Sequence, residues 1–104
     1  MRLHNRQIKG AFWTDEEITT WPLPKRLFYL GIIQVADDSG CLDNSPRMIW
    51  RMLFPEEMTV KEVEQWINEL VTDGKLITYE ADGKRCLYVK NFHNAHQEDG
   101  GECA

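Results

Sequence analysis

The sequence lacks the patterns that define common classes of enzymes, membrane proteins and secreted proteins. Its 104 residues contain no phosphate-binding glycine loop, no nucleophile elbow and no HExxH motif. The longest nearly apolar stretch, residues 27–33, is much shorter than the roughly 20 residues that span a bilayer. Residues 1–10 lack the apolar segment of a secretory signal. We therefore expect a cytoplasmic protein with no enzymatic activity, no cofactor and no membrane attachment.

Cysteine is also scarce. Cys41, Cys86 and Cys103 are scattered and odd in number, which does not indicate a disulfide framework, and we expect reduced thiols. His93 and His96 lie three residues apart upstream of Cys103, and such ligands can hold zinc. A fourth ligand and a CxxC pair are missing, so local hydrogen bonding is the expected role of these histidines and no metal site is predicted.

Positive charge is in the minority. Twelve Lys and Arg face seventeen Asp and Glu, and the net charge of −5 argues against nucleic-acid binding driven by overall charge. Residues 92–104 hold three acidic residues and no Lys or Arg, which leaves −2 for the rest. With 42% hydrophobic residues, the chain is long enough for one globular domain. We expect an N-terminal arm at 1–12, a domain at 13–92 and a flexible tail at 93–104.

Local signals predict several helices. Thr14, followed by Glu17, forms a capping box for a short helix that ends near Trp21. Pro24 suits the first turn of a longer helix that ends at the turn 37–40. This second helix is apolar around much of its circumference, so we expect neighbouring elements to cover it.

A short strand, 41–43, is followed by two further helices. Ser45 is a good cap for a helix over 47–54, with Pro46 at its first position. Thr59 and Glu62 repeat the capping box and open an amphipathic helix that Gly74 closes. Trp50, Phe54 and Trp66 lie at helical spacing and are expected in the core.

The last predicted element is a β-hairpin, with strands 76–80 and 85–90 joined through Asp82–Gly83. This dipeptide favours a type I′ turn, which requires positive φ at both positions. With these two residues as the loop, Ala81 faces Lys84, Glu80 faces Arg85, Tyr79 faces Cys86 and Leu76 faces Val89. Tyr79 and Tyr88 are candidate surface contacts.

The order helix, short strand, helix, helix, hairpin predicts an α+β, mostly helical fold: a winged helix, with a helix-turn-helix and a hairpin wing. The second helix of such a pair commonly enters the major groove. Lys61, Gln65 and Asn68 are the candidate base readers, because Gln and Asn pair with adenine and Lys donates to guanine.

The charge of that helix argues against this role. Its exposed residues include Glu62, Glu64, Glu69 and Asp73 against a single Lys61, a net −3. A solvated surface with no DNA contact is therefore the alternative for this face. Elsewhere, five cations are candidate phosphate contacts that position the domain: Arg47, Arg51, Lys75, Lys84 and Arg85.

The chain resembles the N-terminal domain of phage and prophage replication initiation proteins, the replisome organiser and DnaD-like group. The resemblance rests on residues 13–18, 26–31, 36–40, 53–55, 79–84 and 92–97 (WTDEEI, RLFYLG, ADDSG, LFP, YEADGK and FHNAHQ). It implies a winged helix that binds double-stranded origin DNA or helps to assemble a primosome by recruiting a helicase loader or helicase. Members of the group usually have a further C-terminal region that this sequence lacks, so we expect either a short homologue or a fragment.

Two rival functions use the same scaffold. One is a winged helix for protein contact, in which the acidic helix 59–73 meets a basic partner or the chain forms a homo-oligomer. The other is a transcriptional regulator, which the sequence does not separate from an initiator. The winged-helix fold usually pairs the short strand with the second hairpin strand, so we expect Cys41 and Cys86 near each other.

Overall fold

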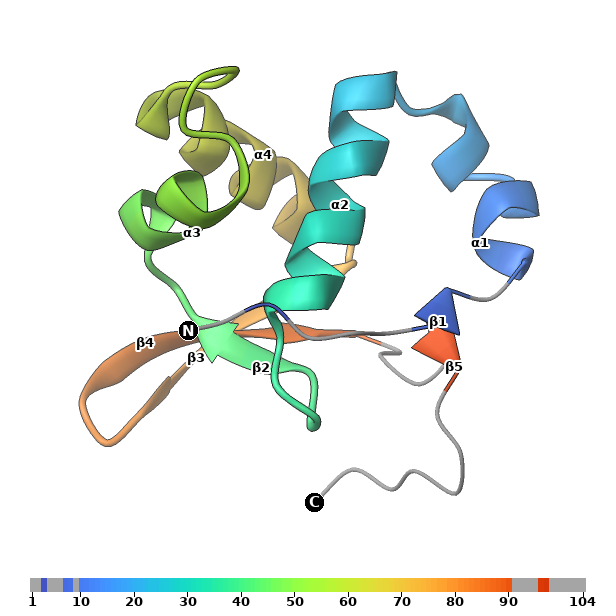
Figure 1. The fold of residues 1–104 in the computed structure, drawn as a ribbon. Helices are drawn as coiled ribbons and strands as arrows, with labels where there is room; N and C mark the ends of the chain where they lie inside the picture. Colours follow the sequence, from blue (N-terminus) through green and yellow to red (C-terminus); the bar gives the residue numbers. More distant parts are fainter. Residues whose placement is uncertain (1–2, 4–6, 9, 91–95, 98–104) are drawn as a thin grey trace.

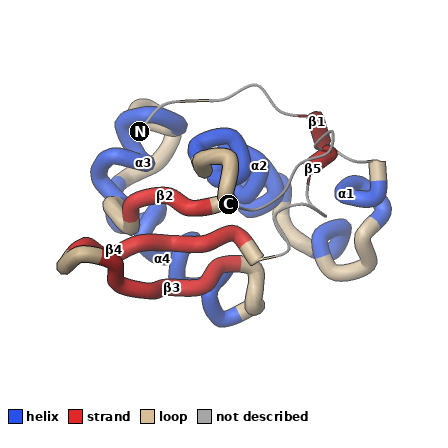
Figure 2. The backbone as a smooth tube through the Cα atoms, turned by 90° about the horizontal axis from the view of Figure 1, so that it is seen from below, coloured by secondary structure: helices blue, strands red, loops and turns tan. Residues whose placement is uncertain are grey.

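Three helices pack on one face of a three-stranded antiparallel sheet in the computed structural model, which describes residues 3, 7–8, 10–90 and 96–97 (Figure 1). The strand order is β2-β4-β3, and the β3–β4 hairpin, called the wing below, extends past the helices (Figure 2). The elements are α2 (Leu23–Val35), β2 (Cys41–Asp43), α3 (Pro46–Leu53), α4 (Val60–Thr72), β3 (Leu76–Ala81) and β4 (Lys84–Val89). The predicted α+β, mostly helical fold is confirmed, and the order is consistent with winged-helix topology.

Short elements precede α2. They are β1 (Gln7–Ile8), α1 (Ala11–Thr14) and the 3-10 helix η1 (Ile18–Thr20), and β1 pairs antiparallel with β5 (His96–Gln97). The prediction that Thr14 opens a helix is wrong, because Thr14 ends α1. Asp15 instead caps the following turn, where its carboxylate accepts hydrogen bonds from the N–H groups of Glu17 at 2.9 Å and Ile18 at 3.0 Å. The Ile18 hydrogen bond is the main reason that the pKa of Asp15 is lowered.

The predicted limits of α2 are confirmed. Pro24 lies in the first turn, where its missing N–H costs no helical hydrogen bond. After Val35 the chain turns through Asp37, whose carboxylate accepts from the N–H groups of Ser39 and Cys41, both at 2.9 Å. Gly40 completes this turn at a φ of 84°.

Neighbouring elements cover α2 as expected along the side that faces the core, but not along its whole circumference. Phe28, Ile32 and Ile33 are fully buried, whereas Leu23 and Leu27 expose 71% and 56% of their surface. The sheet and the other helices pack against only one side of α2, and its other side stays open.

The caps predicted for α3 and α4 are both present. The Ser45 side chain accepts from the N–H of Met48. Thr59 and Glu62 form the reciprocal capping box: the Thr59 hydroxyl accepts from the Glu62 N–H at 3.1 Å, and the Glu62 carboxylate accepts from the Thr59 N–H at 2.9 Å. Gly74, at a φ of 80°, follows α4 as the left-handed cap.

The wing has the predicted register. Its two turn residues, Asp82 and Gly83, have φ values of 53° and 76°, as a type I′ turn requires. The pairs Ala81 with Lys84, Glu80 with Arg85, Tyr79 with Cys86 and Leu76 with Val89 are all as derived.

A single core joins the helices to the inner face of the sheet. Its fully buried side chains come from α2, α3, α4, β3 and β4: Phe28, Ile32, Ile33, Ile49, Val63, Leu70, Leu76, Leu87 and Val89. Trp50, Phe54 and Trp66 pack against this cluster, which confirms their predicted role. The core fixes α4 and the wing relative to each other.

Candidate nucleic-acid interface

A polar stripe follows the outward face of α4. Lys61, Gln65, Asn68 and Thr72 are all exposed and recur at intervals of four, three and four residues, so they lie on one face of the helix. They line a shallow, open groove with Glu64, Glu69 and Asp73 beside them. We call these four residues the α4 stripe. The stripe itself carries one positive charge and no negative charge.

Lys25 of α2 forms ion pairs with two of the acidic residues that flank this stripe. Its Nζ lies 2.6 Å from the Asp73 carboxylate and 3.4 Å from that of Glu69. Lys25 is only 7% exposed, and its ammonium also lies 4.6 Å from the centre of the Trp21 ring. Lys25 offsets one of these two negative charges, so the −3 counted from α4 alone becomes −2 when Lys25 is included.

The other two acidic residues of α4 have different positions. Glu62 is held in the capping box at the first turn, on the side of the helix away from Glu64. Glu64 is exposed at the edge of the α4 stripe. Of the four acidic residues, Glu62 lies on the flank, Glu69 and Asp73 share Lys25, and Glu64 lines the groove without taking part in that ion pair.

The cations of the wing lie at the start of β4, the central strand. Lys84 and Arg85 are both exposed there, and Glu80 faces Arg85 from β3, an edge strand. Arg85 lies two residues before buried Leu87, so its side chain is on the face of the sheet against which the helices pack, whereas Lys84 is on the opposite face. Of the two cations, Arg85 is thus the one directed to the helix side of the sheet.

A backbone hydrogen bond joins this part of the wing to the start of α3. The N–H of Asn44 donates to the carbonyl oxygen of Arg85 at 2.9 Å, two residues before Pro46 begins α3. Arg47 is exposed in the first turn of α3, and Arg51 is exposed one turn later. In Figure 1, α3 and the tip of the wing lie on the same side of the molecule. The structure therefore brings Arg47, Arg51, Lys84 and Arg85 to one end.

Lys75 lies elsewhere. It precedes β3 at the base of the wing, at the end opposite the Asp82–Gly83 turn, and accepts a backbone hydrogen bond from the N–H of Lys90. Its ammonium is 3.3 Å from the Glu17 carboxylate. Of the five predicted phosphate contacts, Lys75 is thus separated from the other four and has an acidic partner within the chain.

The outer face of the sheet carries both described thiols. Cys41 is opposite Tyr88, and Cys86 is opposite Tyr79, so the expectation that the two cysteines lie near each other is confirmed. Both are free and half-buried. The pKa of Tyr79 is raised, chiefly by its hydrogen bond with Cys41 and next by desolvation. Tyr79 is 37% exposed, so it remains a candidate surface contact.

The zinc alternative falls mostly outside the described residues. His93 and Cys103 are not among them, and His96 is described only as a residue of β5. Within the described part of the chain, no three His, Cys, Asp or Glu side chains are placed to hold a metal ion. Over the same residues, no helix has both the length and the apolar character needed to cross a membrane.

Lys25 is the residue of this surface that sequence reasoning missed. A cation inside the apolar run 23–35, one turn after Trp21, was the available signal. Its partners were not apparent, because Glu69 and Asp73 follow it by 44 and 48 residues. Comparison of the chain with protein-family models, curated proteins and solved structures gives no match.

Proposed function

We propose that this chain is a winged-helix domain that binds double-stranded DNA, with no enzymatic activity of its own. The observation that carries the proposal is the α4 stripe, in which Lys61, Gln65 and Asn68 share an exposed face while Lys25 holds the neighbouring acidic residues. A helix with such a face suits the major groove, where Gln and Asn read adenine.

The basic end of the molecule supplies the contacts that position the stripe. Arg47, Arg51, Lys84 and Arg85 are exposed at that end and are suited to phosphate oxygens. With a net charge of −5, these four cations carry much of the attraction to DNA, so binding is weak and strongly dependent on salt.

The cellular role rests on the resemblance to phage and prophage initiators. We propose that the domain binds origin DNA in the cytoplasm and helps to assemble the replisome with a helicase loader or helicase. A transcriptional regulator is the second candidate, since it would use the same surface. Adjacent genes for a helicase loader or a single-strand-binding protein favour replication, whereas an adjacent divergent promoter favours transcription.

The test is a titration of labelled duplex DNA, followed by fluorescence anisotropy at several salt concentrations between about 50 and 200 mM. Lys84→Ala with Arg85→Ala is expected to weaken binding about tenfold and to reduce the salt slope by about 2, because each lost phosphate contact contributes about 0.9. Lys75→Ala is the matched control, since its partner is Glu17. Unchanged affinity in the double variant, or no binding by the parent protein at low salt, would contradict the proposal.

A second pair of variants tests the α4 stripe. Gln65→Ala with Asn68→Ala is expected to reduce discrimination between duplexes that differ at A·T pairs and to leave the salt slope unchanged. Equal weakening of binding to all duplexes, with discrimination unchanged, would show that these residues contact phosphate and do not read bases.

A further inference from the structure

An apolar trough runs along the open side of α2. Trp13 of α1, Leu23 and Leu27 of α2, and Phe54 and Met58 after α3 line a hollow of about 500 Å³ at one end. A second hollow of about 380 Å³ continues past Leu27 and Phe54 to Gln34. We call the two together the α2 trough.

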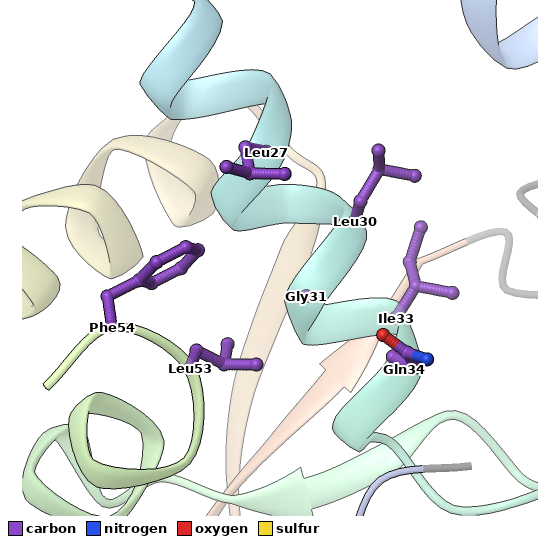
Figure 3. Close-up of a pocket in the computed structure, with 7 residues that line it drawn as sticks. All are labelled: Leu27, Leu30, Gly31, Ile33, Gln34, Leu53 and Phe54. Atoms are coloured by element: carbon purple, nitrogen blue, oxygen red, sulfur yellow. The ribbon is translucent and has the colours of Figure 1, made fainter. Parts of the chain in front are cut away.

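Gly31 of α2 and Leu53 of α3 line the middle of the trough together. Figure 3 shows Leu27 and Phe54 on opposite sides of the gap between α2 and the end of α3, with Leu53 reaching toward Gly31. Gly31 has no side chain to fill this gap, and Leu53 occupies the space where its Cβ would lie. From Leu23 to Gln34 the trough is about 16 Å long, at about 1.5 Å per residue.

The three most exposed large hydrophobic side chains of the described residues line this trough. Trp13, Leu23 and Leu27 are 53%, 71% and 56% exposed. At roughly 200 Å² for each side chain, this is on the order of 350 Å², within the range of functional patches on monomers. A stable dimer buries about 800 Å² per partner, so the trough is too small for a second copy of this chain.

The Trp13 end of the trough carries a small net negative charge. Glu57 and Arg26 both line the hollow at this end, and Glu56 beside Glu57 is exposed, so these three side chains sum to −1. The residues that line the hollow at the Gln34 end are all uncharged. A second copy would bring like charges together at the Trp13 end, whereas a partner with Lys or Arg at one end of an apolar segment complements it.

A helical partner segment fits the trough better than an extended one. The trough offers no strand edge to pair an extended peptide, whose backbone N–H and C=O groups would be left unpaired against apolar side chains. A helix satisfies its own backbone and presents apolar side chains at i, i+4 and i+7. About 11 residues of helix match the length of the trough.

We infer that the α2 trough docks a short amphipathic helix of a partner protein, with apolar residues on one face and basic residues at the end that meets Glu57. The surface is separate from the α4 stripe, so this inference stands independently of DNA binding. It also differs from the protein-contact alternative of the sequence analysis, because the basic partner contacts α2 and not the acidic helix α4.

The probe is a synthetic lactam-bridged helical peptide of about 14 residues, with Leu at i, i+4 and i+7 and Lys at one end. Binding is followed by amide chemical shifts and by Trp fluorescence, with a peptide of the same length that carries Glu in place of Lys as the comparison. The Lys peptide is expected to shift amides of α2 and of residues 53–58, with at least tenfold higher affinity than the Glu peptide. Equal binding of the two peptides, or no binding near 1 mM (a Kd in the weakest class), overturns the inference.

Protein variants locate the site. Leu27→Asp is expected to weaken the Lys peptide at least tenfold, and because Leu27 is exposed the variant should stay folded. Ile77→Asp is the matched control, since Ile77 is 43% exposed on the outer face of the sheet. Glu57→Lys should weaken the Lys peptide and strengthen the Glu peptide. Equal losses in Leu27→Asp and Ile77→Asp, or a dimer by light scattering that Leu27→Asp dissociates, also overturn it.

Discussion

The outward surfaces of α4 and α2 differ in polarity. The four residues of the α4 stripe are polar, and Lys25 forms ion pairs with two of the acidic residues beside them. The outward residues Leu23 and Leu27 of α2 are apolar and more than half exposed. Both helices bury their opposite side in the same core. The buried sides account for stability, so the contrast between the outward sides reflects what each surface contacts. Polar α4 suits a charged, hydrogen-bonding ligand, and apolar α2 suits a hydrophobic one.

The two surfaces also differ in what maintains them. The charge of the α4 surface depends on one residue from another helix, because Lys25 reaches across to Glu69 and Asp73. The shape of the α2 trough depends on an absent side chain, since Gly31 leaves room for Leu53. Substitutions at Lys25 and Gly31 therefore probe the two surfaces separately.

The largest effect is expected between two adjacent residues of α2. Phe28 is fully buried and its ring lies 6.2 Å from that of Phe54, while Leu27 is 56% exposed. Phe28→Ala should lower the free energy of unfolding by about 3–5 kcal/mol, a large part of the total for a domain of this size. Leu27→Ala should change it by less than about 1 kcal/mol. Urea unfolding followed by circular dichroism measures both, and equal losses would mean that the open side of α2 is packed.

The second prediction concerns Lys25. Lys25→Met leaves Glu69 and Asp73 facing each other without a cation, and we expect a loss of about 2 kcal/mol in the free energy of unfolding. The loss is smaller than the 3–5 kcal/mol typical of a fully buried pair, because the two carboxylates are 41% and 28% exposed. Adding Asp73→Asn should recover part of the loss, and Lys61→Met is the exposed control. A double variant as unstable as Lys25→Met would show that the ion pair is not the cause.

Much of the fold was predictable because it depends on local signals. Proline in a first turn, Ser45 and Thr59 as caps, and Asp82–Gly83 with positive φ each act through groups within a few residues. The wing register followed from the turn alone, because a two-residue loop fixes which residues of the two strands face each other. The error at Thr14 is of the same local kind: Asp15, one residue later, accepts the two N–H groups.

The candidate site was less predictable because its electrostatics depend on contacts distant in sequence. Exposure of Lys61, Gln65 and Asn68 followed from helical periodicity. The pairing of Lys25 with α4 and of Lys75 with Glu17 required the packing of separate elements. The open side of α2 was missed for the same reason, because periodicity marks residues as apolar and does not show whether a neighbour covers them.

A smaller effect is expected at alkaline pH. Burial, with the carboxylates of Asp15 and Glu17 nearby, raises the pKa of Tyr29 on α2 from 10.0 to about 12. A raised pKa in the folded state means that the contribution of Tyr29 is complete below about pH 10 and is lost as the pH rises toward 12. Tyr29→Phe should therefore be less sensitive to pH in this window, by about 1 kcal/mol at pH 11. Parallel loss of stability in both proteins between pH 10 and 12 would contradict this.

The smallest change in stability is expected for Gly31→Ala, although it alters the α2 trough directly. The new Cβ would lie 2.7 Å from Cδ1 of Leu53, so Leu53 has to move toward the open hollow. This cost is offset by the helix preference of Ala over Gly, about 1 kcal/mol, and we expect the free energy of unfolding to stay within about 1 kcal/mol of the parent. Affinity for the Lys peptide should nevertheless fall several-fold, because Leu53 then occupies the trough. In a Leu53→Ala background, Gly31→Ala meets no side chain there and should stabilise the protein by about 1 kcal/mol. Destabilisation in both backgrounds would show that Gly31 is needed for the backbone of α2 and not for the shape of the trough.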